Sequence, residues 1–427
     1  MCFTQRPSPF GPVNSQGGWY KKLPGEHLSM KIALALAVVL LAATPSRAAV
    51  PGNTVKIGIL NDQSGPFADQ SGKGSVVAAQ LAAEDFKAEA DGFKVEIIYG
   101  DHQNKPDIGS AIVREWVDRE GVATVADAVN SGVGLAVNQI MRDRHRVFLA
   151  SNVGTSDLTG KFCAPTTVQW TFDTWAFGNA AARALTQAGA KSWFFISFDY
   201  ALGAALERDT TGVLKTLGGT VAGSVKHPLN TTDFSSYLLQ AQASGAEVVA
   251  FGDTGTDLIN AVKQGHEFGI TPAQKLTGLF SQIVDVDAIG LQDAQGLLLS
   301  EAFYWDLNDD TRAFAKRFAE HMPGRVPTEN QAGVYSSVLA YLRAVRRADT
   351  IDGEAVVAEM RKAPIPDKLF GPVTVRMDGR ATHPMYVFRV KAPAASKSRW
   401  DVYELVSTIS AEQAFRPLDE GGCALVK

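Results

Sequence analysis

The fold is decided by the stretch GILNDQSGPFADQSGKGSVVAAQLAAEDF, which runs from Gly58 to Phe86. Its first residues belong to a short apolar run, VKIGIL at 55–60, and its last part carries apolar residues at helical spacing. A Ser-Gly-Pro turn at 64–66 separates the two parts. The stretch therefore predicts a strand, a turn and a helix, which together form the first unit of an α/β protein.

The glycines of this loop do not form a phosphate-binding motif. A Walker loop requires G-x-x-x-x-G-K-[ST], whereas Phe67 stands five positions before Gly72, and Gly74 follows Lys73. The dinucleotide fingerprint G-x-G-x-x-G also fails, because Val77 occupies the third glycine position. What remains is either a simple turn or a loop at the carboxyl edge of a sheet, where ligands of open α/β sheets bind. In the second case Phe67 is a candidate ligand contact.

Short apolar runs alternate with longer amphipathic stretches along most of the chain. The predicted strands of the first half are 55–60, 94–100, 122–128 and 146–151, and those of the second half are 192–197, 220–228 and 247–253. This alternation predicts two similar α/β halves, each a Rossmann-like lobe with a parallel central sheet. Because no low-complexity linker separates the halves, we expect close crossings between them rather than a flexible tether.

The beginning of the chain is typical of a targeting segment. Residues 30–48, MKIALALAVVLLAATPSRA, have one Lys, an apolar core and small residues before a plausible cleavage site after Ala48. The alternative is a membrane anchor, but the 12 residues of the core, Ile32 to Ala43, fall short of the about 20 that span a bilayer. We therefore expect a signal peptide that starts at Met30, a dispensable upstream segment, and a mature protein in the periplasm.

Charge and cysteine content narrow the class of partner. The formal net charge is −4 and no basic cluster occurs, which argues against nucleic acid as a partner.

After cleavage only Cys163 and Cys423 would remain. An even number of cysteines in an exported protein predicts a disulfide, which would tether the C-terminal tail, and the alternative is two separately buried thiols.

Two further loops that follow predicted strands carry hydroxyl residues where a helix or turn begins. They are ADAVNSGVGLA at 126–136 and ASNVGTSDLTG at 150–160. Backbone N–H groups at a helix N-terminus can hold a carboxylate, and the hydroxyls of Ser131 and Thr155 can add hydrogen bonds. Each of these two residues, taken alone, is also a common helix cap.

Several segments together resemble the periplasmic binding proteins of the leucine/isoleucine/valine type. The segments are LNDQSGPFADQSGKGSVVAAQLAAEDF, DHQNKPD, NSGVGLAV, LASNVGTSDLTG and SFDYALG, and the similarity runs from about Val55 to the C-terminus. The resemblance implies the type I fold of that family, in which two lobes are joined by a hinge that the chain crosses three times. It also implies a protein that traps a small solute in the cleft and delivers it to an ATP-driven permease of the inner membrane.

The resemblance also implies where the lobes begin and end. The N-terminal lobe is expected at 52–171 and 300–380, and the C-terminal lobe at 172–299 and 381–427. The crossings are expected near Thr171, near Ser300, and between about Gly371 and Met385.

The family's binding residues can be carried over to positions in both lobes. In the first lobe, Ser131, the backbone of Val153 and Thr155 match the groups that hold a ligand carboxylate. In the second lobe, Tyr200 matches a tyrosine that covers the ligand. The resemblance also places Asp253 and Thr254 in the next second-lobe loop at the site.

Gln282 is a departure from the family pattern. It stands where amino-acid-binding members place an acidic residue for the ligand's ammonium group, so an amino-acid ligand is in doubt. Asp253 could supply the missing charge, or it could be the N-cap of the helix that follows it.

Aromatic residues cluster near two of the expected crossings. Trp170 and Phe172 lie at the entry to the second lobe, and Trp305 lies in EAFYWD. Rings that face a cleft would favour a flat or apolar ligand such as an aromatic carboxylate. The alternative is that these rings pack the core and the hinge.

Other functional classes lack their motifs. No G-x-S-x-G elbow and no H-E-x-x-H helix occurs, so an exported hydrolase is a weaker hypothesis. The calcium loop suggested by Asp306, Asn308 and Asp310 has Thr311 where Gly is required. A transcription regulator of similar architecture would need a DNA-reading headpiece. We expect a monomer without cofactor or metal, and a periplasmic sensor that presents its closed form to a receptor remains the alternative function.

Overall fold

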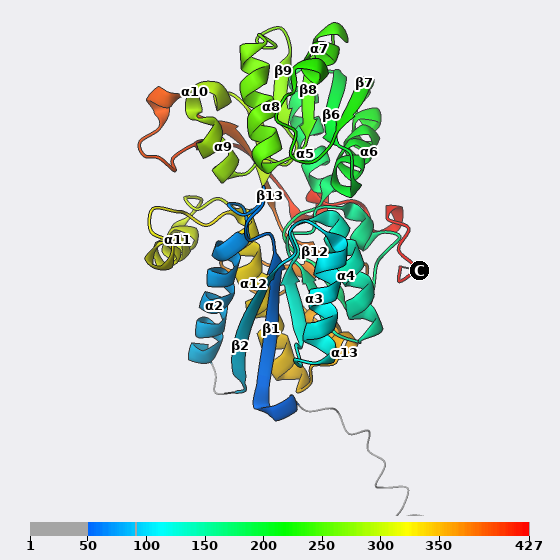
Figure 1. The fold of residues 1–427 in the computed structure, drawn as a ribbon, viewed down its shortest axis with the longest axis vertical. Helices are drawn as coiled ribbons and strands as arrows, with labels where there is room; N and C mark the ends of the chain where they lie inside the picture. The colour runs from blue at the N-terminus through cyan, green and yellow to red at the C-terminus, as the bar shows by residue number, and fades with distance from the viewer. Residues whose placement is uncertain (1–49, 90–91, 427) are drawn as a thin grey trace, which may run out of the picture. The chain divides into compact units, whose positions relative to one another are not determined.

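The computed structural model describes residues 50–89 and 92–426, so the expected signal peptide and upstream segment lie outside the described residues. The described chain contains two α/β lobes, each built on its own sheet (Figure 1). The first sheet has the strand order β2-β1-β3-β4-β5 and is parallel throughout. Its strands are β1 (Thr54–Asn61), β2 (Lys94–Asp101), β3 (Thr124–Asp127), β4 (Val147–Ala150) and β5 (Thr167–Gln169).

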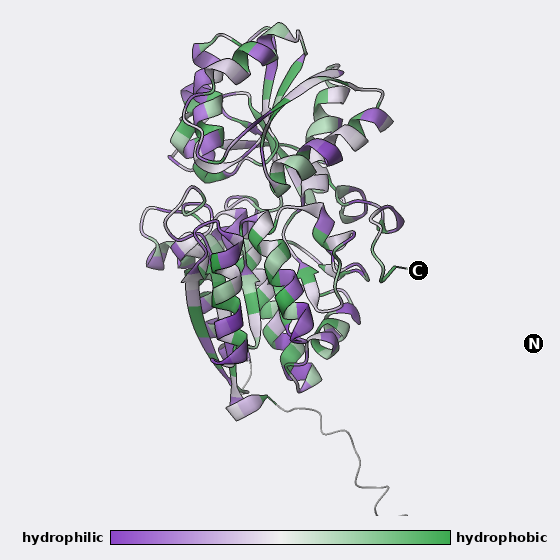
Figure 2. Cartoon of the chain, turned by 45° about the vertical axis from the view of Figure 1, so that its right-hand side comes forward, coloured by the Kyte–Doolittle hydropathy of each residue, from purple (hydrophilic) through white to green (hydrophobic). Residues whose placement is uncertain are grey.

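Helices cover both faces of this first sheet, as a parallel sheet requires. They are α2 (Gly72–Glu89), α3 (Pro106–Asp118), α4 (Ser131–Asp143), α12 (Glu329–Ala348) and α13 (Gly353–Arg361). α12 packs against α2, and α3 packs against α4. The strands β3 and β4 are buried along their whole length, and Figure 2 shows both hydrophobic and hydrophilic residues on the surrounding helices.

The second sheet has the order β14-β13-β10-β9-β8-β6-β7. Its parallel strands are β6 (Ser192–Phe198), β7 (Thr220–His227), β8 (Val248–Gly252), β9 (Lys275–Gly278) and β10 (Leu298–Glu301). β13 (Met385–Val390) and β14 (Tyr403–Ile409) join the edge in antiparallel pairing. The parallel centre was predicted, whereas the antiparallel edge was not, because these two strands come late in the chain and follow no βαβ pattern.

The helices of the second lobe and the short elements complete the fold. The helices are α5 (Thr174–Gln187), α6 (Ala201–Thr216), α7 (Ser235–Ala243), α8 (Gly255–Glu267), α9 (Ile283–Ile289) and α10 (Leu291–Ala294). α11 (Asp309–His321) follows β10 in the chain and packs against α2 of the first lobe. The short elements are η1 (Pro51–Asn53), η2 (Ser156–Thr159), β11 (Thr374–Val375), β12 (Ala381–Thr382), η3 (Pro393–Ala395), α14 (Ala411–Ala414) and η4 (Leu418–Glu420).

The chain passes between the two sheets after β5, after β10 and between β12 and β13. Arg380, which is fully buried, connects the first and third of these passages. Its guanidinium donates hydrogen bonds to the carbonyl oxygens of Trp170, of Phe172 at 2.7 Å and of Ala381 at 2.8 Å. The cation also lies 4.4 Å from the ring centroid of Phe415. One side chain thus joins the first passage, the third passage and the C-terminal tail.

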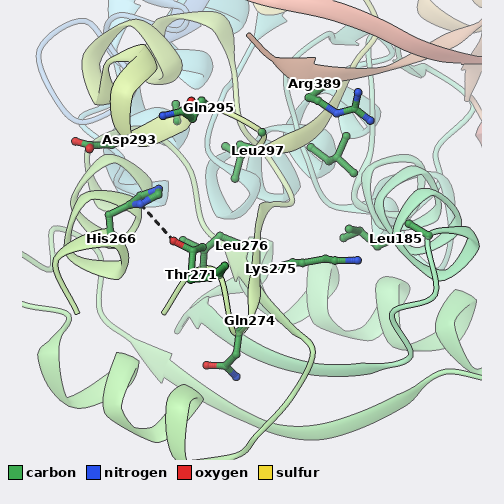
Figure 3. Close-up of a pocket in the computed structure, with 15 residues that line it drawn as sticks. Leu185, His266, Thr271, Gln274, Lys275, Leu276, Asp293, Gln295, Leu297 and Arg389 are labelled. Atoms are coloured by element: carbon green, nitrogen blue, oxygen red, sulfur yellow. Dashed lines mark hydrogen bonds between the residues drawn. The ribbon is translucent and has the colours of Figure 1, made fainter. Parts of the chain in front are cut away.

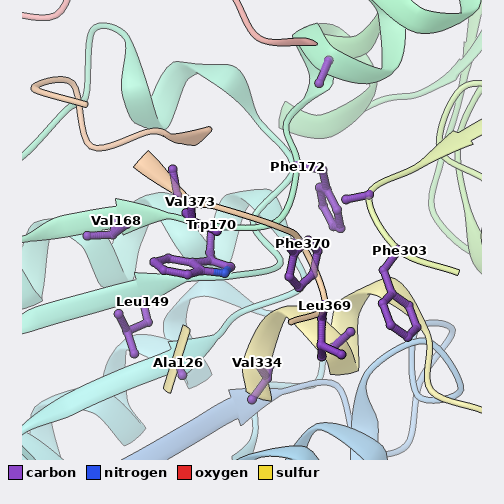
Figure 4. Packing of buried hydrophobic residues seen from close by; sticks show 14 of the residues in the cluster. Ala126, Leu149, Val168, Trp170, Phe172, Phe303, Val334, Leu369, Phe370 and Val373 are labelled. Carbon is purple, nitrogen blue, oxygen red and sulfur yellow. The ribbon is translucent and has the colours of Figure 1, made fainter. Parts of the chain in front are cut away.

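An apolar cluster surrounds these passages (Figure 4). Trp170 lies at its centre, and its Nε1–H donates to Ser336 Oγ of α12 at 2.8 Å. Leu369, Phe370 and Phe303 pack in the same cluster from segments far apart in the sequence. The hinge is therefore a packed core rather than a loose linker.

The C-terminal tail returns to the first lobe. Cys423 is bonded to Cys163, which confirms the predicted disulfide. Arg416 donates to the carbonyl oxygen of Ser156 at 3.0 Å and accepts at its own carbonyl from Arg376 at 2.8 Å. The tail, expected with the rest of 381–427 in the second lobe, thus contacts the first lobe, where its disulfide partner Cys163 lies.

Candidate ligand-binding site

Loops from both sheets meet at the carboxyl ends of their parallel strands. The close approach of the two lobes is seen at Gly154, which follows β4. A Cβ atom at Gly154 would lie 2.6 Å from Leu202 Cδ1 of the second lobe, 3.5 Å from Ser131 Oγ and 3.9 Å from Phe280 Cε1. A side chain at this position would require the Leu202 side chain to shift, so glycine lets the backbone of the first lobe approach the second closely. The carboxyl edge is where open α/β sheets bind ligands.

Ser131 and Thr155 lie against each other in the first lobe. Asn130 is the N-cap of α4, since its side chain accepts from the N–H groups of Gly132 and Val133. Ser131 Oγ is therefore not needed as a cap, and it accepts from the N–H of Thr155 at 3.2 Å. Thr155 Oγ1 does cap η2, since it accepts from the N–H of Asp157 at 3.3 Å. Ser131, Val153 and Thr155 are all fully buried.

A strained turn positions the start of α4. Asp127 and Ala128 have φ values of 83° and 61°, in the left-handed region that residues other than glycine rarely adopt. The Asp127 carboxylate accepts from Asn61 Nδ2 at 2.9 Å and from Asn152 Nδ2 at 2.7 Å. Burial raises the pKa of Asp127 to about 6, and the side-chain hydrogen bonds oppose this shift. Such strain persists where the surrounding structure holds it, and it is commonest at binding sites.

Tyr200 and Asp253 follow β6 and β8 of the second lobe. Asp253 Oδ2 lies 3.2 Å from His227 Nε2, and His227 Nδ1 lies 3.0 Å from the carbonyl oxygen of Pro228. Since a carbonyl can only accept, Nδ1 carries a proton, and the His227–Asp253 contact shares a second one. Burial alone would lower the pKa of His227, but Asp253 and the neighbouring Asp257 more than offset this and raise it. Asp253 is not the helix cap, because Thr254 holds the N-cap position of α8.

Thr254 and Gln282 contact the first lobe directly. Gln70 Nε2 donates to Thr254 Oγ1 at 2.7 Å and to Asp285 Oδ2 at 2.9 Å. Gln282 Nε2 donates to Asn330 Oδ1, at the start of α12, at 2.6 Å. Both of these predicted residues therefore join the lobes, and the contact partners Gln70 and Asn330 were not predicted.

None of the three predicted aromatic residues at the crossings, Trp170, Phe172 and Trp305, is the ring that reaches the loop of Gly154. Trp170 lies in the hinge core, and Trp305 Nε1–H donates to the carbonyl oxygen of Trp400 at 2.9 Å within the second lobe. These contacts argue against the prediction that the two tryptophans face a ligand. The Phe172 ring meets the Phe280 ring edge-on, with ring centroids 4.8 Å apart, and it is Phe280 that reaches the loop of Gly154.

Phe67 lies in the contact between the lobes. A Cβ atom at Gly255, the first residue of α8, would lie 2.6 Å from the carbonyl oxygen of Pro66 and 3.2 Å from Phe67 Cδ1. Gly255 has a φ of 63°. The loop at 62–71, between β1 and α2, therefore packs on the loop that carries Asp253 and Thr254.

Several buried polar atoms around these loops have no hydrogen-bond partner among the residues described. Three belong to the second lobe and sit on residues predicted for the site: Tyr200 OH, Asp253 Oδ1 and Gln282 Oε1. Ser281 Oγ of the second lobe and Asn152 Oδ1 of the first lobe are also buried and have no hydrogen-bond partner among the described residues. Leaving such a group unpaired costs about 1–3 kcal/mol, so a polar ligand that met these atoms would stabilise the site.

Comparison with known proteins decides the family. A family model described as periplasmic binding protein matches residues 54–397. The chain belongs to the periplasmic binding protein family. The predicted resemblance and the predicted fold class are thereby confirmed.

Relatives and solved structures of the family agree with this assignment. A "Leu/Ile/Val-binding protein homolog 6" of Brucella melitensis is 31% identical over 66% of this chain and 71% of its own length. A periplasmic binding protein from Burkholderia mallei has a TM-score of 0.85 at 41% identity, and covers 88% of this chain and 100% of its own. A branched chain amino acid ABC transporter periplasmic ligand-binding protein from Burkholderia xenovorans has a TM-score of 0.79 at 39% identity, and covers 87% of this chain and 100% of its own.

A fold neighbour of lower identity was solved with a ligand. The R. palustris solute-binding protein in complex with benzoate has a TM-score of 0.76 at 19% identity, and covers 87% of this chain and 99% of its own. At this identity the likeness concerns the fold alone.

A separate pocket of about 490 Å³ lies elsewhere in this periplasmic binding protein (Figure 3). It is lined by Lys275 and Leu276 at the start of β9, by Leu297 before β10, and by Arg389 of β13. These positions are at the amino ends of the parallel strands, opposite the edge that carries Asp253 and Gln282. The pocket is therefore distinct from the candidate site.

Two negative findings apply to residues 50–89 and 92–426. No group of three or more His, Cys, Asp or Glu side chains is arranged to hold a metal ion. No helix in this part of the chain is both long and apolar enough to span a membrane.

Proposed function

We propose that this periplasmic binding protein captures a small carboxylate-bearing solute between its lobes and delivers it to an ABC permease of the inner membrane. One observation carries the proposal. Ser131, the first residue of α4, and Thr155, the N-cap of η2, adjoin Gly154, where the first lobe approaches Leu202 and Phe280 of the second lobe. The second-lobe segments that carry Leu202 and Phe280 also carry buried oxygens that lack partners within the described residues. The printed role of the Burkholderia xenovorans relative supports the transport assignment.

The first lobe is suited to hold the carboxylate. Ser131 Oγ already accepts from the N–H of Thr155, so its own O–H remains available to donate. The N-terminus of α4 adds the positive end of the helix dipole. Neither feature needs a buried cation, which would bind the carboxylate at a high desolvation cost.

The second lobe is suited to hold a hydrogen-bond donor at the other end of the solute. Asp253 Oδ1 and Gln282 Oε1 are both acceptors, and Tyr200 OH can donate or accept. An amino acid and a hydroxylated aromatic acid each combine a carboxylate with such a donor. The first class is suggested by the names of the Brucella relatives, and the second by the fold neighbours solved with 4-hydroxybenzoate and 3,4-dihydroxy benzoic acid.

Between these two classes, Gln282 favours the hydroxylated acid because an amide carries no charge to pair with an ammonium group. Asp253 could still supply that charge, although its other oxygen is engaged by His227. A comparison of 4-hydroxybenzoate with benzoate, and of leucine with 4-methylpentanoate, would isolate the contribution of the donor in each class.

The experiment that tests the proposed function begins with the solute that the protein already carries. We would express the chain from Ala49 in the periplasm, release bound molecules under denaturing conditions, identify them by mass spectrometry, and confirm binding by calorimetry with refolded protein. A stoichiometric small acid is the expected result. Protein that carries nothing and binds neither amino acids nor aromatic acids would contradict the proposal.

We further infer that binding occurs without chemical conversion. His227, the histidine at the site, is engaged by Asp253 and Pro228 rather than by a serine, so a Ser-His pair for acyl transfer is not formed there. Export to the periplasm, a monomeric state and the permease as partner belong to the same proposal. A closed form presented to a signalling receptor is the second candidate, and a permease-deletion strain that still responds to the solute would favour it.

A further inference from the structure

Three buried carboxyl groups lie where the lobes meet, outside the ligand contacts proposed above. Asp285 is the third residue of α9 and Glu301 is the last residue of β10, both in the second lobe, whereas Glu329 is the first residue of α12 in the first lobe. Asp285 is 2% exposed, Glu301 is 1% exposed and Glu329 is 0% exposed. We call these three residues the carboxyl cluster.

Neutral donors hold each member of the carboxyl cluster. Asp285 accepts from Gln70 Nε2 of the first lobe, Glu301 accepts from Tyr403 OH at 2.6 Å, and Glu329 Oε2 accepts from the N–H of Ala302 at 2.8 Å. Glu329 Oε1 has no partner in the part of the chain that the structure describes. Within that part, no hydrogen bond or ion pair joins the cluster to Lys, Arg or His.

A buried carboxylate without a cation is costly, so the group takes up a proton instead. Burial raises the pKa of Asp285 to about 7 and that of Glu301 to about 8. Burial also raises the pKa of Glu329 well above its ordinary value, and the charge of Glu301 adds to this shift. At neutral pH the cluster therefore carries protons that solvated carboxyl groups would have released.

Separation of the lobes would expose part of this cluster. The hydrogen bond between Gln70 and Asp285 crosses from one lobe to the other, as does the one between Gln282 and Asn330 beside it. Breaking them would admit water to Asp285 and Glu329, whose pKa values would then fall toward the ordinary value near 4.

We propose that closure of the lobes on the solute takes up protons at Asp285, Glu301 and Glu329, so that acidification strengthens closure and solute binding. The proposal rests on the proposed function for its solute, but the closure itself can be measured without one. The closed form is favoured as pH falls through the range from about 8 to about 4, and is disfavoured as pH rises through it. Each proton taken up changes the dissociation constant by up to about tenfold per pH unit.

Other titratable groups lie near the cluster and must be separated from it. Asp253 raises the pKa of Asp285, and Tyr403 faces Glu301. His227 and Asp127, at the candidate site, have raised pKa values as well. Substitutions within the carboxyl cluster do not change these other groups. Any pH dependence of closure that remains in the cluster variants is therefore due to them.

The test is small-angle scattering of the refolded protein without solute, at about pH 5 and about pH 8. We expect the radius of gyration of the unchanged chain to be smaller at the lower pH. In Glu329→Gln and Asp285→Asn the amide mimics the protonated acid, so the two radii should agree more closely. Glu84→Gln is the matched control, because Glu84 is exposed on α2 and its change should leave the pH dependence intact.

Calorimetry with leucine or 4-hydroxybenzoate, whichever binds, in buffers of different ionisation enthalpy then counts the protons taken up. We expect net uptake near neutral pH that falls in Glu329→Gln. The proposal would be overturned if the pH dependence were the same in the unchanged chain, in Glu329→Gln and in Asp285→Asn. It would also be overturned if the pH dependence disappeared in His227→Gln but in neither of these two variants. If neither solute binds, the proposed function fails on that panel while scattering still decides the proton linkage.

Discussion

The hinge around Arg380 and the candidate site around Asp253 are both buried and both polar, yet their hydrogen bonds differ. Arg380 donates to three backbone carbonyl groups and lies over the Phe415 ring. At the candidate site, Asp253 Oδ1 and Gln282 Oε1 have no partner among the residues described. A satisfied network stabilises one arrangement of the chain, whereas unsatisfied atoms gain stability from a ligand. The difference predicts that substitutions at the hinge affect folding and substitutions at the site affect binding.

The largest effect is expected from Arg380→Met. The change would leave the carbonyl groups of Trp170, Phe172 and Ala381 without their donor in a buried region. Breaking a buried charged network of this kind costs about 3–5 kcal/mol in the free energy of unfolding. Urea denaturation followed by circular dichroism measures it.

Arg389→Met is the matched control for Arg380→Met. Arg389 is about half exposed, and its contact with Glu404 is 3.6 Å long. Such a surface pair contributes about 0–1 kcal/mol. Equal losses in the two variants would contradict the view that the hydrogen bonds of Arg380 hold the hinge.

The second largest effect is expected from removing the disulfide with Cys163→Ser and Cys423→Ser. Loss of a native disulfide typically costs about 2–5 kcal/mol in the free energy of unfolding. Because Arg416 still anchors the tail to Ser156, we expect a folded protein with an unchanged dissociation constant for its solute. If the variant were fully folded but bound its solute about tenfold more weakly, the C-terminal tail would influence the geometry of the site. Effects on stability and effects on binding would then not be separate.

The sequence was informative where structure is local. Strand and helix alternation predicted both lobes, and the loops after β3 and β4 predicted Ser131 and Thr155 as candidate ligand contacts. The structure places these two residues in contact, and their role in binding stays a prediction. The N-cap role of Asn130 follows from its position before α4 and could have been recognised in VNSG.

The parts that were missed depend on residues far apart in the chain. Gln70 and Asp285 are separated by 215 positions, and Arg380 and Phe172 by 208. Nothing in the residues next to Gln70 or Arg380 indicates such a partner. Aromatic residues near a crossing, such as Trp170 and Trp305, can either pack the core or face a ligand, and only three-dimensional contacts distinguish the two.

A smaller effect, confined to binding, is expected from Thr155→Val. The change keeps the shape of the side chain but removes the hydroxyl from the first lobe's candidate carboxylate site. We expect solute binding to weaken by about 1–2 kcal/mol, because one hydrogen bond to a charged group is lost. Calorimetry with the solute recovered from the protein measures the change.

Thr159→Val is the matched control for Thr155→Val. Thr159 is the buried last residue of η2, the short helix that Thr155 caps, and its hydroxyl donates to the carbonyl oxygen of Ser156 at 3.4 Å. It should lower stability slightly without changing affinity. Unchanged affinity in Thr155→Val would remove Thr155 from the site, and equal losses in both variants would assign the effect to η2.

The smallest effect is expected from Trp305→Phe. The substitution removes the hydrogen bond to the Trp400 carbonyl oxygen, but Tyr304 OH also donates to that oxygen, at 3.1 Å, so the carbonyl group keeps a partner. We therefore expect a loss of about 0.5–1.5 kcal/mol in the free energy of unfolding and no change in affinity. Phe280→Leu is the comparison, since the Phe280 ring reaches the Gly154 loop between the lobes and its loss should weaken binding. If Trp305→Phe weakened binding as much as Phe280→Leu, Trp305 would belong to the ligand contacts as well as to the packing of the second lobe.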